Sequence, residues 1–201
     1  MAKLYFKYGA MGCSKSAQAL ITKFNYEERG MTVLLMKPAI DTRDEGIIYS
    51  RIGLQSPALC VPGDTDLYKL YTEQYSDRQV IIVDECQFLQ PEQVDQLGEI
   101  VIDYDVPVLC FGLRTDFLMR TFPGSQRLFE IAESITEIKS VCRCGSKAIV
   151  NARLDGNGRV VFEGEQIALG GNGRYVAMCR KCWRKARKEQ EAADKAAEGA
   201  E

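Results

Sequence analysis

The segment that most constrains the fold is an eight-residue stretch near the N-terminus, Gly9-Ala10-Met11-Gly12-Cys13-Ser14-Lys15-Ser16. It follows a short apolar run at residues 3–8 and precedes a helix-like pattern at residues 15–29. A strand, a glycine-rich turn and a helix in this order are the setting of a phosphate-binding loop, G-x-x-x-x-G-K-[ST]. Such a loop aims backbone N–H groups and a helix N-terminus at an anion. We therefore expect a nucleotide-binding protein.

The match to that pattern fails at one position, because Ser14 stands where the second glycine is expected. Glycine suits the position because it adopts positive φ freely and leaves no Cβ near the phosphates. Backbone strain of roughly 1–3 kcal/mol would weaken ATP binding about ten- to a hundred-fold, unless Gly12 gives the loop another path. We expect Lys15 to reach the β- and γ-phosphates and the Ser16 hydroxyl to bind Mg²⁺. The alternative is a glycine-rich turn without a ligand.

Composition limits the remaining classes of protein. The chain has 201 residues, enough for one main domain with a small appendage. Its net charge of −2 provides no general basic surface for nucleic acid, and no apolar run reaches the roughly 18 residues of a membrane span. The N-terminus lacks the apolar core of a secretory signal. We therefore expect a cytoplasmic protein that binds neither nucleic acid nor membrane.

Cysteine and histidine usage narrow the chemistry further. Without an export signal, the eight cysteines are expected to be reduced thiols or metal ligands rather than disulfides. The chain has no histidine, which excludes imidazole as a base, a nucleophile or a metal ligand. Any proton transfer must therefore use a carboxylate, a lysine, a tyrosine or a cysteine.

Apolar runs alternate with helical patterns along the first two thirds of the chain. We expect strands at residues 3–8, 32–36, 80–83 and 106–111, and helices at residues 15–29, 66–75, 92–103 and 126–138. The run Val80–Val83 is apolar throughout, as in a parallel strand buried on both faces. This alternation predicts an α/β fold with a mostly parallel sheet flanked by helices. Residues 41–62 show little periodicity and are expected to form a long, partly mobile loop.

The pattern changes after Ser140. Short strand-like runs separated by glycine-rich turns predict a small second domain of hairpins. From residue 184 onward the chain carries five positive and five negative charges, and we expect a frayed helix or disorder there. The predicted organisation is a nucleotide-binding domain at 1–140, a second domain at 141–183 and a charged tail at 184–201.

Two adjacent acids, Asp84 and Glu85, follow the strongest predicted strand. In phosphate-loop proteins an aspartate at such a strand end holds Mg²⁺, and Glu85 is placed to act on a nucleophile. Two buried acids are costly unless they are paired or functional, whereas a solvated turn is the alternative. After the second strand, Arg43 could clamp phosphate oxygens and Asp41 could assist the metal or the base. A surface turn is a stronger alternative for this segment than for the acidic strand end.

Four cysteines form two close pairs, Cys142 with Cys144 and Cys179 with Cys182, separated by 34 residues. Two thiolate pairs on turns are the sequence pattern of a tetrahedral four-cysteine zinc site. Because four protein ligands close the site, we expect a structural Zn²⁺. Redox pairs or free thiols are the alternatives.

Several motifs occur in a characteristic order: Lys7-Tyr8-Gly9-Ala10-Met11, Asp41-Thr42-Arg43-Asp44, Ser50-Arg51-Ile52-Gly53, Val83-Asp84-Glu85-Cys86-Gln87-Phe88, Phe111-Gly112-Leu113-Arg114-Thr115-Asp116-Phe117, Gly124-Ser125-Gln126, Glu163-Gly164-Glu165-Gln166 and Gly170-Gly171-Asn172. With the cysteine pairs, these motifs resemble the zinc-containing thymidine kinase family, its bacterial branch in particular, as far as about Trp183. The resemblance implies a RecA-like α/β domain and a small zinc-bearing β subdomain whose lasso-like loop covers the nucleoside. It also implies a homotetramer and the reaction of ATP with thymidine to give ADP and dTMP.

The resemblance also implies roles for particular residues. Glu85 is similar to the general base that accepts the proton of the 5′-hydroxyl. The ATP site would comprise Gly9, Ala10, Met11, Gly12, Cys13, Ser14, Lys15, Ser16, Arg43, Asp84, Glu85, Cys86 and Gln87, with Mg²⁺ on Ser16 and Asp84. The nucleoside site would comprise Met11, Phe88, Leu113, Phe117, Ala168, Leu169, Gly170, Gly171 and Tyr175. Aromatic stacking and a few backbone hydrogen bonds suit a flat, partly apolar base, although the residues alone would assign Phe88, Leu113 and Phe117 to the core.

The departure at Ser14 leaves alternatives open. The metal, base and nucleoside elements are retained, which favours a working or slowed thymidine kinase. The first alternative is a catalytically impaired paralogue that binds nucleoside or ATP. The second is a nucleic-acid-binding zinc ribbon attached to an ATPase, for which the basic residues between Arg180 and Lys188 are the only support.

Overall fold

A computed structural model describes residues 1–41, 46–166 and 174–198. The chain forms two compact units. The first, here called the sheet unit, comprises Met1–Gly9, Ser14–Arg114 and Thr121–Ile138. The second, here called the cysteine unit, comprises Ala10–Cys13, Thr115–Arg120 and Lys139–Glu201.

The sheet unit is built on a six-stranded sheet in the order β5-β2-β6-β7-β1-β8, in which every neighbouring pair is parallel. Its strands are β1 (Leu4–Gly9), β2 (Val33–Pro38), β5 (Leu59–Val61), β6 (Val80–Val83), β7 (Val108–Gly112) and β8 (Ser134–Ile138). Its helices are α1 (Lys15–Glu27), α2 (Leu67–Leu70), η1 (Tyr71–Tyr75), η2 (Cys86–Phe88), α3 (Pro91–Tyr104) and α4 (Pro123–Ile131). The predicted α/β class with a parallel sheet flanked by helices is therefore confirmed.

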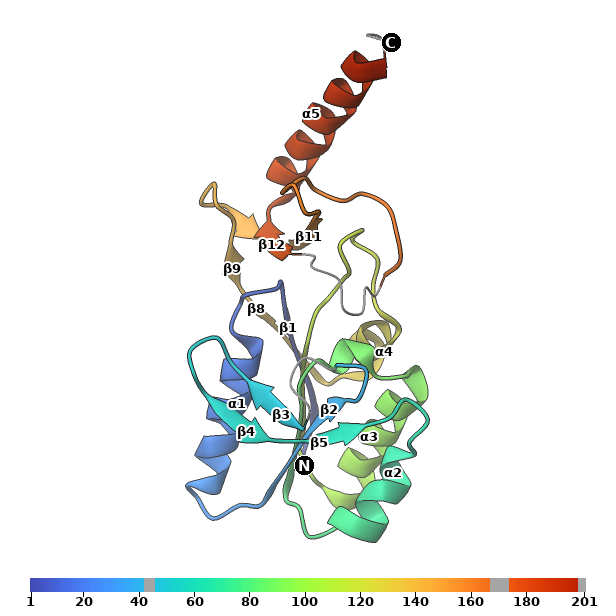
Figure 1. The fold of residues 1–201 in the computed structure, drawn as a ribbon. Coiled ribbons are helices and arrows are strands. Elements are labelled where there is room, and N and C mark those ends of the chain that lie inside the picture. The colour runs from blue at the N-terminus through green and yellow to red at the C-terminus, as the bar shows by residue number, and fades with distance from the viewer. Residues whose placement is uncertain (42–45, 167–173, 199–201) are drawn as a thin grey trace. The chain divides into compact units, whose positions relative to one another are not determined.

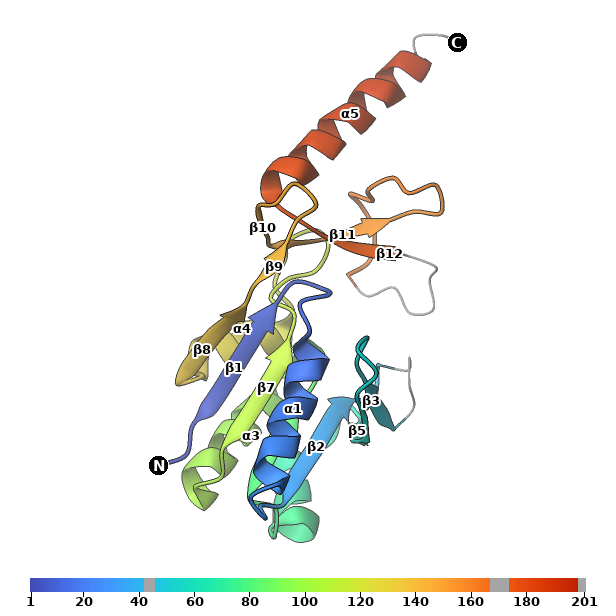
Figure 2. The ribbon, with the colours of Figure 1, turned by 90° about the vertical axis from the view of Figure 1, so that its left-hand side faces the viewer.

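Helices cover both faces of this sheet, because successive strand residues point to opposite sides. On one face, Ala19 and Leu20 of α1 pack with Val80 and Ile82 of β6. On the other face, α3 and α4 pack over Ile81 and its neighbours in the sheet. Figure 2 shows α1 on the near side of the strands and α3 on the far side. Burial on both faces explains why β6 and β7 are apolar throughout.

The prediction of a helix over residues 126–138 is wrong in its second half. Helix α4 ends at Ile131, and Ser134–Ile138 form the edge strand β8 beside β1. The apolar spacing of Leu128, Ile131, Ile135 and Ile138 fits a helix, but the segment Ser134–Ile138 is rich in β-branched residues that favour strands. The backbone groups along the free edge of β1 gain partners from β8, which outweighs the local periodicity.

The prediction of a long loop over residues 41–62 is also wrong for its described part. Ile47–Tyr49 (β3) and Gln55–Pro57 (β4) form an antiparallel hairpin, and β5 follows as the other edge of the parallel sheet. At the turn of the hairpin, the backbone N–H of Leu54 donates to the Ser50 hydroxyl at 3.0 Å, and Gly53 has φ of +88°. Three-residue strands are too short to show a clear alternation of apolar and polar residues, so the residue pattern does not indicate them.

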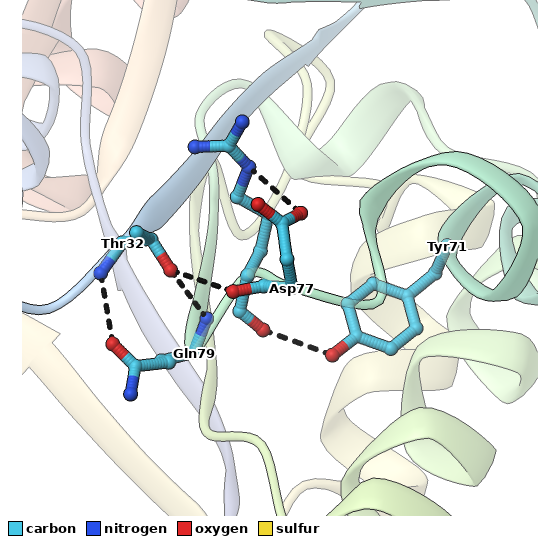
Figure 3. Close-up of polar contacts among 5 residues, drawn as sticks. Thr32, Tyr71, Asp77 and Gln79 are labelled. Atoms are coloured by element: carbon cyan, nitrogen blue, oxygen red, sulfur yellow. Dashed lines mark hydrogen bonds and ion pairs between the residues drawn. The ribbon is translucent and has the colours of Figure 1, made fainter.

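Side-chain contacts hold the entries to β2 and β6 together (Figure 3). The Thr32 hydroxyl donates to the carbonyl oxygen of Asp77 at 2.8 Å, and the Thr32 N–H donates to the Gln79 side chain at 3.1 Å. The Tyr71 hydroxyl donates to the carbonyl oxygen of Arg78 at 2.9 Å. These bonds hold the starts of the two neighbouring strands next to each other. They therefore help to set the register of β2 against β6, and with it which residues stand at the C-terminal ends of both strands.

The cysteine unit contains the hairpins that the sequence predicts. Ser140–Val141 (β9) pairs with Lys147–Ala148 (β10), and Val150–Leu154 (β11) pairs with Arg174–Met178 (β12), both antiparallel. The charged tail continues from the last cysteine pair as one helix, α5 (Arg180–Glu198), shown in Figure 1. None of the helices in the described ranges is long and apolar enough to cross a membrane.

Candidate functional site

The acidic end of β6 meets the start of α1 within the sheet unit. Asp84 is 3% exposed, and its backbone N–H donates to the carbonyl oxygen of Met36 at 3.0 Å. The Ser16 hydroxyl hydrogen-bonds the Asp84 carboxylate, and the charge of Lys15 acts on it. The structure thus brings together the side chains expected to hold phosphate and metal, from segments about 70 residues apart in the sequence.

The electrostatics of Asp84 favour an added cation. Burial and the neighbouring charge of Glu85 raise the pKa of Asp84 to about 7, although the Ser16 hydroxyl and Lys15 act in the opposite direction. Among the described residues, Asp84 Oδ1 has no hydrogen-bond partner. A buried, unpartnered carboxylate oxygen beside a hydroxyl is a donor set that suits Mg²⁺.

The backbone of the phosphate loop adopts left-handed conformations at two positions. Ser14 has φ of 65° and ψ of 29° as the N-cap of α1, and its side chain makes no capping hydrogen bond. Gly12 has φ of 74°. Although Gly12 is itself left-handed, Ser14 still adopts the left-handed conformation for which glycine is favoured. The expected alternative path of the loop through Gly12 is therefore not seen. The next residue, Lys15, is only 8% exposed.

Glu85 also lies in the left-handed region, with φ of 52°, at the sharp turn between β6 and η2. The Gln87 amide nitrogen donates to Glu85 Oε2 at 2.5 Å, and the Gln87 amide oxygen accepts from the Leu113 N–H at 2.9 Å. A strained turn with its acid held by a neighbouring side chain is typical of functional sites. Gln87 therefore links the position of Glu85 to the end of β7.

Two glycines allow that turn to pack closely. A Cβ at Gly112 would lie 2.6 Å from Cys86 Sγ and 2.8 Å from the Gln87 amide oxygen. A Cβ at Gly124 would lie 2.6 Å from the carbonyl oxygen of Leu89. Cys86 is fully buried beside Cys110, and burial raises its pKa well above the usual value. Cys86 therefore packs as a neutral thiol next to the acids.

The residues assigned by resemblance to the nucleoside site fall in both units. In the sheet unit, Phe88 packs edge-on against Phe122 with ring centroids 5.6 Å apart, and the Leu113 carbonyl oxygen accepts from the Ser125 hydroxyl at 2.6 Å. In the cysteine unit, Phe117 is 1% exposed. Tyr175 is half-buried on β12, and Met11 belongs to the same unit.

Some predicted residues lie outside the described part of the chain. These are Arg43 and the segment Ala168, Leu169, Gly170 and Gly171. Asp41 is described, and its carboxylate lies 3.5 Å from the ammonium of the buried Lys37. Neutralising the charge of a buried lysine is a structural role that accounts for an acidic residue at position 41.

Strand β11 contributes two polar residues that the sequence motifs do not indicate, the buried Asn151 and the half-buried Arg153. Asn151 is 2% exposed and hydrogen-bonds the backbone of Met11 and of Thr115. The guanidinium of Arg153 lies 4.0 Å from the centre of the Phe117 ring. The only available signal was a polar residue inside an apolar strand pattern, which is too common to indicate a role.

The four cysteines of the two pairs converge in the cysteine unit. Their sulfur atoms all lie within 4.8 Å of one another, and Cys144 Sγ lies 3.6 Å from Cys179 Sγ. Hydrogen bonds from the Ser146 hydroxyl and backbone lower the pKa of Cys144 to about 6, whereas hydrogen bonds with Cys144 and Cys179 raise the pKa of Cys182 to about 12. A thiolate is the form that binds metal. The cluster therefore suits a tetrahedral metal ion.

The sequence is similar to the sequences of known thymidine kinases. The sequence profile of the thymidine kinase family matches residues 2–183. A thymidine kinase of Legionella pneumophila (strain Paris) is 50% identical over 187 residues, covering 90% of this chain and 88% of its own. Thymidine kinases of Enterobacteria phage T4 and Vibrio vulnificus (strain CMCP6) are 50% and 47% identical, covering 91% and 92% of this chain and 96% and 98% of theirs. The chain belongs to the thymidine kinase family.

Proposed function

We propose that the protein transfers the γ-phosphate of ATP to the 5′-hydroxyl of thymidine, giving ADP and dTMP. Family membership supports the substrates. The observation that carries the chemistry is the cluster of Ser16, Lys15 and Asp84, whose Oδ1 has no hydrogen-bond partner among the described residues, with Glu85 next in the chain. Phosphoryl transfer depends mainly on positioning and charge neutralisation, and this cluster provides for both.

Each residue has a separate task in this proposal. Ser16 and Asp84 would hold Mg²⁺, which would supply positive charge to the phosphate oxygens. Lys15 binds the β- and γ-phosphates at the start of α1, where the helix dipole also favours an anion. Glu85 accepts the proton of the 5′-hydroxyl while Gln87 holds its carboxylate in place. Arg43 would add charge at the γ-phosphate.

The remaining expectations concern the nucleoside and the second metal. Met11, Phe88, Leu113, Phe117 and Tyr175 would surround the thymine base, with backbone groups of residues 168–171 pairing with its edge. The cluster of Cys142, Cys144, Cys179 and Cys182 would hold a structural Zn²⁺, which its sulfur spacing supports. We also propose a cytoplasmic homotetramer on the basis of family resemblance, which sedimentation velocity would test.

One observation favours a second candidate, a paralogue that binds nucleoside but transfers phosphate poorly. Ser14 has φ of 65°, so its Cβ occupies a place that glycine leaves open. In a coupled assay with ATP, Mg²⁺ and thymidine, we expect the wild type to produce ADP and Ser14→Gly to lower the KM for ATP about tenfold. If Ser14→Gly produced ADP and the wild type did not, the protein would be the impaired paralogue.

The role of Glu85 is tested separately. We expect Glu85→Gln to reduce kcat at least a hundredfold, because general base catalysis contributes about 10²–10⁴-fold, while calorimetry shows thymidine binding within about threefold of wild type. The matched control is Glu99→Gln, the same change at an exposed position of α3. Unchanged turnover in Glu85→Gln would remove Glu85 from this role.

A further inference from the structure

The buried side chain of Asn151 joins two loops that are far apart in the sequence. Its Oδ1 accepts a hydrogen bond from the Met11 N–H at 2.8 Å. Its Nδ2 donates to the carbonyl oxygen of Thr115 at 2.7 Å. Asn151 lies in β11 and is 2% exposed. Both polar atoms of this amide are therefore engaged by backbone groups.

The two contacts require opposite chemistry from one side chain. The Met11 N–H needs an acceptor, whereas the Thr115 carbonyl needs a donor. A terminal amide offers both, a carboxylate offers acceptors alone, and an aliphatic side chain offers neither. A buried backbone group that loses its partner is destabilised by the full loss of hydration. Asparagine therefore matches this site in a way that neither Leu nor ionised Asp can.

A second residue of the same strand face reinforces the arrangement. Arg153 is two positions along β11 from Asn151, so both side chains point to the same side of the strand. Its guanidinium lies 4.0 Å from the centre of the Phe117 ring and donates to the carbonyl oxygen of Glu163 at 3.2 Å. This face of β11 thus contacts the 115–117 segment twice, at Thr115 and at Phe117.

These segments all belong to the cysteine unit, in which Ala10–Cys13 and Thr115–Arg120 pack with β11 although their flanking residues belong to the sheet unit. We infer that Asn151 is a positioning residue for thymidine, which sets the separation of Met11 from the 115–117 segment. The inference rests on the proposed function, in which Met11 and Phe117 line the nucleoside site. Asn151 acts through them on nucleoside affinity, whereas the transfer step depends on Lys15, Asp84 and Glu85.

The inference predicts a separation of KM from kcat. We expect Asn151→Leu to raise the KM for thymidine about tenfold, because two buried hydrogen bonds are lost. We expect kcat at saturating thymidine and ATP to stay within threefold of wild type. Steady-state kinetics with thymidine and ATP varied in turn would measure both.

A second variant provides a readout that general destabilisation would not produce. In Asn151→Asp, the ionised carboxylate cannot donate to the Thr115 carbonyl, but the protonated acid can donate there and still accept from Met11. Burial raises the pKa of a carboxyl group. We therefore expect the thymidine KM of Asn151→Asp, divided by that of wild type, to fall at least threefold between pH 8 and pH 6. The charged or ionisable side chains on the segments around Asn151 that carry these contacts are Cys13, Asp116, Arg120, Arg153 and Tyr175. All of them are present in wild type and variant, so division by the wild-type value isolates the effect of the introduced carboxyl group.

The control is Asn157→Leu, at an exposed asparagine in the turn after β11, which should leave all constants unchanged. The inference is overturned if wild type phosphorylates thymidine while the KM of both Asn151 variants matches that of Asn157→Leu. It is equally overturned if the thymidine KM of Asn151→Asp, divided by that of wild type, is the same at pH 6 and pH 8. If Asn151→Leu does not fold, this pH measurement alone tests the inference. Absence of thymidine phosphorylation by wild type would instead contradict the proposed function.

Discussion

At the scale of single residues, the buried carboxylate of Asp84 links the candidate site to stability. Its pKa is raised from 3.8 to about 7 by burial and by Glu85. The folded state therefore holds the proton more tightly than the unfolded state, so stability is lost as pH rises from about 4 to 7 and is constant above that. A shift of about three pKa units corresponds to at most about 4 kcal/mol. In the metal-free protein, Asp84 is thus a source of instability at neutral pH.

We therefore predict that Asp84→Asn abolishes activity but stabilises the metal-free protein. At pH 8 without Mg²⁺, urea unfolding should give a higher free energy of unfolding for the variant by about 1–4 kcal/mol, and the difference should vanish near pH 4. Asp64→Asn, at an exposed loop position, is the control and should change neither property. A lower stability of Asp84→Asn at pH 8 would contradict the electrostatic account.

Sequence reasoning reached some single residues and missed others. The mismatch at Ser14 is visible in the sequence because a motif prescribes glycine there. Its left-handed φ, however, depends on how the whole loop is held. Asn151 carries no local signal, since its partners lie 140 and 36 residues away. A motif can identify a residue type at a position, but hydrogen-bond partners depend on the folded chain.

At the scale of elements, the turn after β6 depends on the close approach of β7. A Cβ at Gly112 would lie 2.6 Å from Cys86 Sγ. We predict that Gly112→Ala lowers the free energy of unfolding by about 1–3 kcal/mol and reduces kcat, because the turn that holds Glu85 must shift. Thermal unfolding and the coupled assay would measure the two effects.

Gly98 provides the matched control for this substitution. It lies inside α3, where an added Cβ would be 3.4 Å from Ile131 Cδ1, an ordinary contact. Gly98→Ala should therefore stabilise the protein by about 0.5–1 kcal/mol and leave kcat unchanged. If Gly112→Ala behaves like Gly98→Ala, the close approach does not restrain the turn that holds Glu85.

Helices and strands whose apolar residues recur at a clear spacing agree with the sequence-based prediction, whereas elements without such a spacing do not. Helix α3 and strand β6 have apolar patterns that fit one structure alone, and both appear at the expected residues. Strand β8 and the short strands β3, β4 and β5 were missed. These strands lie in a hairpin or at the edges of the sheet, where pairing with a neighbour decides the conformation more than propensity does.

At the scale of the whole molecule, the two compact units differ in what stabilises them. The sheet unit has two apolar clusters around the sheet. The cysteine unit has a small buried cluster that includes Cys142, Ala148 and Cys179. Small domains with little apolar core usually need metals or disulfides. The cysteine unit should therefore depend on its metal, whereas the sheet unit should not.

We predict that Cys182→Ser removes the zinc, of which wild type should contain one ion per chain by atomic absorption. Hydrogen exchange should then accelerate in β11 and β12, while β1, β6 and β7 stay protected. Cys60→Ser, in β5 of the sheet unit, is the control and should retain zinc and protection. Full protection of β11 in a zinc-free Cys182→Ser protein would exclude a structural role for the metal.

The class of fold, the phosphate-loop motif, the acidic strand end and the cysteine pairs can all be recognised in the amino-acid sequence. These features depend on residues within a few positions of one another, so local periodicity and spacing contain them. Three features depend on the folded chain: Ser134–Ile138 form a strand, Ser14 is left-handed, and Asn151 bridges Met11 and Thr115. The physical reason is that buried backbone groups must find partners, and folding alone brings those partners together.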